Sequence, residues 1–232
     1  MIVYINKVGI EGVTNMDPQV ILNKILMIPA ILLAFTFHEY AHAITADRLG
    51  DKTPRFQGRI TLNPIAHIDP MGFILILIMG FGWAKPVQTN PSAYKNYYKD
   101  DLKVSAAGPI ANLIVAFIFA FLYIIAENFL PLSGGISIII IKILMFTSYL
   151  NCILFFLNLI PIPGFDGFHI VRDLSPKFFY NVSDSILRYQ FILFMALIFP
   201  ILPGGRSVFD YIVGLPGMWL FLRFTDLAGM LF

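Results

Sequence analysis

Long apolar runs separated by short polar stretches dominate the chain. A helix that crosses a membrane needs about 20 consecutive, mostly apolar residues. Five runs reach or approach this length: 21–46, 102–126, 136–160, 186–203 and 207–232. Prolines and glycines interrupt the last two runs, so the pattern defines their ends less sharply. The pattern predicts an all-α, multi-pass membrane protein with about five transmembrane helices, of which the first three form the core.

A further apolar stretch, 71–84, is too short for a full crossing. As a helix it would rise about 21 Å, against a hydrocarbon core of about 30 Å. Gly80 and Gly82 also interrupt it, and Pro86 follows closely. The neighbouring segments 55–62 and 82–90 have the alternation or composition of strands. We therefore expect a short re-entrant or β-like region at the membrane edge, with unpaired backbone groups that an extended peptide can bind.

Basic residues are concentrated on one side of the predicted spans. Eight Lys and Arg residues lie between 48 and 103, whereas the turn 127–135 has none. The positive-inside rule places 48–103 and 161–188 in the cytoplasm and 127–135 outside. This arrangement requires 71–84 to return to its starting side. It predicts a multi-pass protein of the cell membrane.

Composition agrees with a membrane protein. The chain is 58% hydrophobic and 13% charged, whereas soluble domains have roughly 45–50% apolar and about 25% charged residues. Little remains for a separate aqueous domain, so we expect one domain over 1–232, with a catalytic core at 21–172 and flanking C-terminal helices at 173–232. The net charge of +2 is too small to indicate a nucleic-acid partner.

The first predicted span carries the most informative motif, His38-Glu39-Tyr40-Ala41-His42. On a helix, the two imidazoles lie on one face, one turn apart, which is how zinc hydrolases hold their metal, with the Glu as general base. The preceding residues 25–37 contain no charge. Ionisable groups inside a membrane helix are costly and usually functional. The motif therefore predicts a zinc hydrolase that acts within or at the edge of the bilayer.

A catalytic zinc site takes three protein ligands and leaves one position open. Asp166 is the candidate for the third ligand, because it follows the third predicted span and precedes Gly167. Pro161 and Pro163 break the helix before it, so the chain can turn the carboxylate back toward the His pair. The alternative is an ordinary turn Asp before Gly. For Asn158, at the end of the span, a helix cap competes with a catalytic role.

Several motifs together resemble a known family. They are HEYAH at 38–42, NPIAHIDPMG at 63–72, FGWAKPVQTNP at 81–91, GPIAN at 108–112 and NLIPIPGFDG at 158–167. They are similar to the signatures of the site-2 proteases, a family of intramembrane zinc metalloproteases. The resemblance covers roughly residues 28–172 and is greatest to the compact prokaryotic branch without a PDZ or CBS domain. Phe165 stands where the family often has Leu, an exchange of one apolar residue for another.

The resemblance implies a complete catalytic set. His38, His42 and Asp166 would bind one Zn²⁺ per chain, Glu39 would activate the metal-bound water, and Asn158 is a candidate for stabilising the oxyanion. The implied reaction is hydrolysis of peptide bonds in transmembrane segments of other proteins, as in regulated intramembrane proteolysis. The implied partners are transmembrane substrates, the lipid bilayer and a regulatory membrane protein. The oligomeric state is left open.

Three further residues are candidates for substrate binding: Asn112, His67 and Lys85. Each has a plainer interpretation. Asn112 can join two helices by hydrogen bonds, His67 can stabilise a turn, and Lys85 can extend its ammonium group to the membrane interface.

Two other functions use the same ligands. A membrane metal transporter or metallochaperone would hold a metal through His and Asp, but it would not need the carboxylate of Glu39. An inactive relative that serves as a binding module would be expected to lack a ligand or the base, and none is missing here.

Overall fold

The computed structural model describes residues 18–80, 82–131 and 134–231. Two residues of the predicted external turn, 132 and 133, lie outside the described part, as do residues 1–17 at the N-terminus. The described residues are mostly helical and form no β-strand; they contain only isolated bridges. The predicted all-α class is thereby confirmed.

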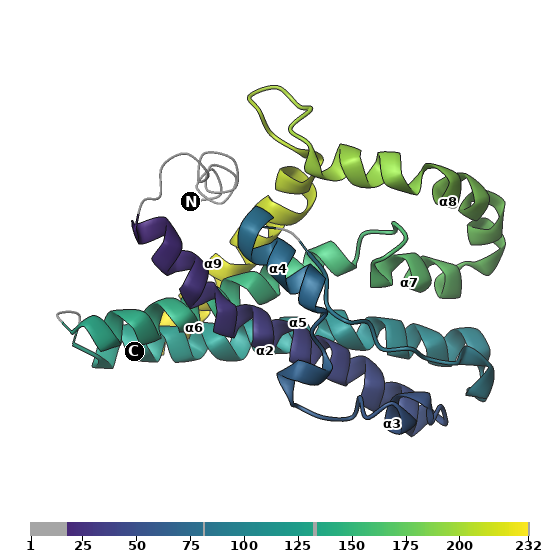
Figure 1. Ribbon diagram of the computed structural model, residues 1–232, viewed down its shortest axis with the longest axis horizontal. Coiled ribbons are helices and arrows are strands. Elements are labelled where there is room, and N and C mark those ends of the chain that lie inside the picture. Colours follow the sequence, from purple (N-terminus) through teal and green to yellow (C-terminus); the bar gives the residue numbers. More distant parts are fainter. Residues whose placement is uncertain (1–17, 81, 132–133, 232) are drawn as a thin grey trace.

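Three helices are long and apolar enough to cross a membrane: α2 (Pro18–Leu49), α5 (Tyr97–Phe129) and α6 (Gly135–Asn158). They correspond to the first three predicted spans. Each of them packs against the other two, side by side in Figure 1. Their length and apolar composition indicate a membrane protein, and together they hold the candidate site.

The predicted count of five spans is not confirmed. Among the described residues, α9 (Leu215–Gly229) has only 15 residues and is too short to cross a membrane. The helix α8 (Pro176–Ile198) is longer, but it is not apolar enough. A π-helical turn, Asp210–Gly214, leads into α9, which packs on α5 and α6. In Figure 1, α8 lies away from the three long helices. It also carries the charges of Lys177, Asp184 and Arg188.

The short helix α4 (Pro70–Met79) covers the first part of the apolar stretch 71–84. Asp69 caps its start by accepting a hydrogen bond from the N–H of Gly72, and Gly80 ends it in the left-handed conformation, with φ +79°. Its 10 residues rise only about 15 Å. As expected, this stretch is too short to cross the bilayer as a helix.

The strand predicted at 55–62 is wrong. The chain there forms the short helix α3 (Thr53–Phe56) and a turn closed by Gly58, with φ +65°. Arg55 bonds both oxygens of Asp47 on α2, at 2.8 and 2.7 Å, and Pro54 suits the start of a helix. A tertiary ion pair therefore overrides the local alternation of polar and apolar residues.

The β-like structure predicted for 82–90 is limited to one bridge among the described residues, and the segment forms no strand. Ala84 pairs with Ile68, and the N–H of Lys85 donates to the carbonyl of His67 at 2.9 Å. The remaining short elements are η2 (Pro64–Ala66), η3 (Pro91–Ala93) and α7 (Asp166–Leu174). The last of these carries the predicted third metal ligand.

Cysteine labelling tests whether 70–79 stays on one side of the membrane. In a Cys152→Ser background, cysteines at the exposed positions Lys52 and Lys95 should react from the same, cytoplasmic side. A cysteine at Glu127, near the other end of α5, should react only from the opposite side. Labelling of Lys52 and Lys95 from opposite sides would show that the segment between them crosses the membrane.

Candidate metal centre

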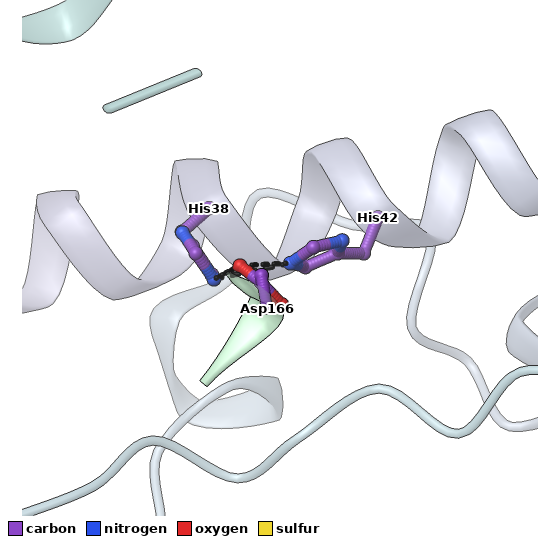
Figure 2. A group of neighbouring side chains, drawn as sticks. All are labelled: His38, His42 and Asp166. Atoms are coloured by element: carbon purple, nitrogen blue, oxygen red, sulfur yellow. Dashed lines mark hydrogen bonds and ion pairs between the residues drawn. The ribbon is translucent and has the colours of Figure 1, made fainter. Parts of the chain in front are cut away.

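The three predicted ligands come together from α2 and α7 (Figure 2). Nε2 of His38 and Nε2 of His42 each lie 3.3 Å from Oδ2 of Asp166, and the two nitrogens are 3.1 Å apart. In tetrahedral zinc sites with bonds of about 2.0–2.1 Å, neighbouring ligand atoms are about 3.3 Å apart. The nitrogen and oxygen donors and their spacing therefore fit zinc.

The turn after α6 brings Asp166 to the histidines. Gly164 adopts φ +101°, which L side chains rarely do. Gly167 leaves no room for a side chain, because a Cβ there would overlap the carbonyl of Leu159 and lie 2.6 Å from that of Ile160. The glycines thus permit a tight reversal, and α7 starts at the metal-facing carboxylate.

The electrostatic surroundings favour an ionised Asp166. Burial alone would raise the pKa of its carboxyl group, but the neighbouring imidazoles of His42 and His38 hold that pKa well below its usual range. This effect depends on a protonated imidazole, whereas metal binding needs both an ionised carboxylate and neutral imidazoles, so binding of the metal would release the imidazole proton.

Both imidazoles are oriented from behind by α5. Nδ1 of His38 lies 2.7 Å from Oδ1 of Asn112, and Nδ1 of His42 lies 2.7 Å from the carbonyl of Val104. With a proton on each Nδ1, both rings donate to these oxygens and turn the lone pair of Nε2 toward the site. Asn112 is completely buried and also donates to Asn151 on α6, at 2.8 Å.

A glycine allows α5 to approach the rings so closely. A Cβ at Gly108 would overlap Nε2 of His42 and lie 2.5 Å from Cε1 of His38. Any side chain here would displace the nitrogen that faces the metal position. Gly108 begins the GPIAN motif, whose last residue is the Asn112 that orients His38.

Glu39 lies beside the histidines and is held by the loop region. Its Oε2 accepts a hydrogen bond from the N–H of Val87 at 2.7 Å and lies 3.6 Å from Nη2 of Arg59. Arg59 is also buried and donates to the carbonyl of Lys85. The candidate base is therefore fixed between a buried guanidinium and the extended segment 82–90.

The other predicted residues make different contacts. Nδ2 of Asn158 donates within its own helix, to the carbonyl of Leu154 at 3.0 Å. His67 is fully buried, with Nε2 2.7 Å from the carbonyl of Thr61, and burial lowers its pKa. Lys85 is exposed. The catalytic role of Asn158 and the substrate-binding roles of Asn112, His67 and Lys85 stay predictions.

The sequence did not reveal every residue around the site. Val104 acts through its backbone carbonyl, which leaves no signal in its side chain. In the sequence, Arg59 is one of the basic residues that indicate topology, and nothing marks it as a partner of Glu39. Its position beside an apolar span is the one hint in the sequence that it has a partner, because a charged group needs a partner when it is buried.

The family model described as peptidase family M50 matches residues 26–132 and 125–200. The chain belongs to peptidase family M50. This confirms its resemblance to the site-2 proteases.

Three relatives agree with this assignment, and all are provisionally named zinc metalloproteases. YwhC of Bacillus subtilis is 38% identical over 191 residues, which cover 78% of this chain and 87% of YwhC. Rip2 of Mycolicibacterium smegmatis is 30% identical over 66% of this chain and 59% of its own length. MJ0611 of Methanocaldococcus jannaschii is 30% identical over 66% of this chain and 72% of its own length. No solved structure gives a significant match.

Family membership and geometry agree on the chemistry. Zinc is the cofactor implied for this M50 chain, and the cluster of His38, His42 and Asp166 fits it. The chain is a zinc metalloprotease with membrane-spanning helices.

Proposed function

We propose that this M50 protease is an intramembrane endopeptidase that hydrolyses peptide bonds in transmembrane segments of other membrane proteins. The observation that carries the proposal is the cluster of His38, His42 and Asp166, with Glu39 beside it, packed among three membrane-length helices. A protease for soluble substrates has no need to bury its site in such helices. The expected partners are transmembrane substrates and the bilayer.

Each residue has a distinct task in the proposed reaction. His38, His42 and Asp166 would hold the zinc. When bound, zinc would act as a Lewis acid and lower the pKa of a bound water to about 7. Glu39 accepts a proton from the attacking water and later returns it to the leaving amine. The Val87 N–H and Arg59 hold the carboxylate of Glu39 in place for both transfers.

The extended segment 82–90 is the proposed holder of the substrate. Three of its N–H groups are bound to the protein, to the carbonyl of His67, to Glu39 and to Asp51. Within the described residues, Ala84 makes its one bridge, so the opposite edge of the segment has no partner strand. Such an edge can pair with the main chain of an unwound substrate.

The proposed location is the cell membrane, with the active site near the cytoplasmic face. The supporting observation is the distribution of Lys and Arg, which are abundant between α2 and α5. The metal ligands on α2 lie toward its C-terminal end, where this basic region begins.

Cleavage of a panel of single-span substrates tests the proposed function. The purified protease in lipid vesicles should cut spans that contain glycine faster than poly-Leu spans, and a chelator should abolish both activities. Each glycine weakens a helix by about 1 kcal/mol, which corresponds to about a fivefold increase in the unwound form. Equal cleavage of both spans would refute holding by strand pairing. Zinc flux into the vesicles without any cleavage would instead favour a transporter.

A further inference from the structure

One face of α5 contacts both histidines of the metal centre and the helix α7, without supplying a ligand. Four of its residues recur every three or four positions and so lie on one side of the helix: Asp101, Val104, Gly108 and Asn112. Val104 and Asn112 orient the two histidines by hydrogen bonds, and Gly108 leaves the space that their rings occupy. Asp101 extends this face by one turn toward α7, which carries the third ligand.

Asp101 binds α7 through a buried ion pair. Nη2 of Arg172 bonds Oδ2 of Asp101, and Nε of Arg172 donates to Oδ1 of Asp173 at 2.7 Å. The Asp101 and Asp173 residues are 4% and 8% exposed, so the cluster is largely removed from water. The ring of Tyr97 on α5 lies 5.8 Å from the guanidinium carbon of Arg172, which encloses the cation further.

This cluster lies on the short helix that starts with the metal ligand. α7 has only nine residues, from Asp166 to Leu174, so a shift of Arg172 moves the whole helix. Among the residues that the structure describes, Arg172–Asp101 is the one ion pair that joins α7 to α5. Removing Arg172 would leave the buried carboxylates of Asp101 and Asp173 without a cation, which strongly disfavours the docked position.

We propose that Arg172 is a positioning residue for Asp166. Its ion pair with Asp101 docks α7 on the same face of α5 that orients the histidines, and it thereby sets how tightly the centre retains zinc. The proposal rests on the ligand set proposed above. Groups behind a ligand commonly change metal affinity by about 10–100-fold.

Zinc release to a chelator tests the proposal without any substrate. Arg172→Met keeps much of the side-chain volume but removes the charge, and it should speed zinc release by about 10–100-fold. The visible spectrum of the Co²⁺-loaded variant should also change, because Asp166 is displaced. The charge-swapped double variant, Asp101→Arg with Arg172→Asp, should recover slower release than either single change.

A matched control separates positioning from general loss of an ion pair. Arg55 also pairs with a buried Asp, through two hydrogen bonds, but its own side chain is more exposed than that of Arg172, and the pair joins α3 to α2 instead of α7 to α5. Arg55→Met should therefore release zinc at the wild-type rate. If Arg172→Met does not fold, Asp101→Leu tests the same contact, because it keeps a similar size and removes the oxygen that accepts the bond from Arg172.

The outcomes distinguish this inference from the proposed metal site. Wild-type protein that binds no zinc would overturn the ligand set itself. Wild-type protein that retains zinc, together with Arg172→Met or Asp101→Leu variants that match its release rate and cobalt spectrum, would overturn the positioning role alone. Equally fast release from Arg55→Met would also overturn it, because the effect would then follow from the loss of any ion pair.

Discussion

Replacing Glu39 with Gln should leave zinc in place and reduce peptide cleavage by at least about 10²–10⁴-fold, the contribution typical of a general base. The carboxylate lies next to the metal cluster without belonging to it. Gln has nearly the same shape, and its carbonyl oxygen can still accept the hydrogen bond from Val87. It has no group that takes up a proton near neutral pH, so binding and chemistry should separate.

Zinc content and substrate turnover, measured on the same preparation, check this expectation. Glu127→Gln is a matched control, because it makes the same exchange at an exposed position near the end of α5, where Glu127 bonds only its neighbour Tyr123 in the contacts described. It should cleave at the wild-type rate. Wild-type turnover in Glu39→Gln would contradict the proposed mechanism and favour a transport function, which does not need this base.

The second large effect is expected from a single methyl group. Gly108→Ala places a Cβ where it overlaps Nε2 of His42 and crowds His38. The rings must move, and α5 is fixed on both sides by α2 and α6. Because a misplacement of about 1 Å can cost about 10²-fold in rate, we expect strong loss of both zinc retention and activity.

Gly229→Ala provides the control for this substitution. Gly229 is also helical, near the end of α9, but a Cβ there meets nothing within 4 Å. This variant should match the wild type in zinc content, turnover and thermal stability. A Gly108→Ala variant that keeps full zinc content would show that α5 does not confine the imidazoles as closely as the structure indicates.

Much of the frame could be predicted because it depends on local features. Apolar runs of sufficient length gave the positions of α2, α5 and α6. The spacing of His38 and His42 on one helix fixed their common face. Pro161, Pro163 and Gly167 indicated a turn before and after Asp166, and the structure brings this residue to the His pair.

The errors arose where tertiary contacts decide the outcome. The alternation at 55–62 suggested a strand, but the bond of Arg55 to Asp47 lies outside any local pattern. The two further spans expected near the C-terminus are not confirmed: α9 has only 15 residues, and α8 carries three charged side chains.

The face of α5 was hidden for a related reason. Val104 contributes a backbone carbonyl and Gly108 the absence of a side chain, so neither residue carries a chemical signature. Asn112 was noticed for its polarity, but only the fold shows that it contacts His38 and Asn151. Composition and spacing identify ligands more readily than the groups that orient them.

The most direct test of the central claim is X-ray absorption at the zinc edge, combined with elemental analysis of the purified protein. We predict about one zinc per chain, with two imidazoles and oxygen donors at about 2.0–2.1 Å. Asp166→Ala should lose most of this zinc. A sulfur ligand at about 2.3 Å, which would have to come from Cys152, or full zinc retention in Asp166→Ala would contradict a centre built from His38, His42 and Asp166.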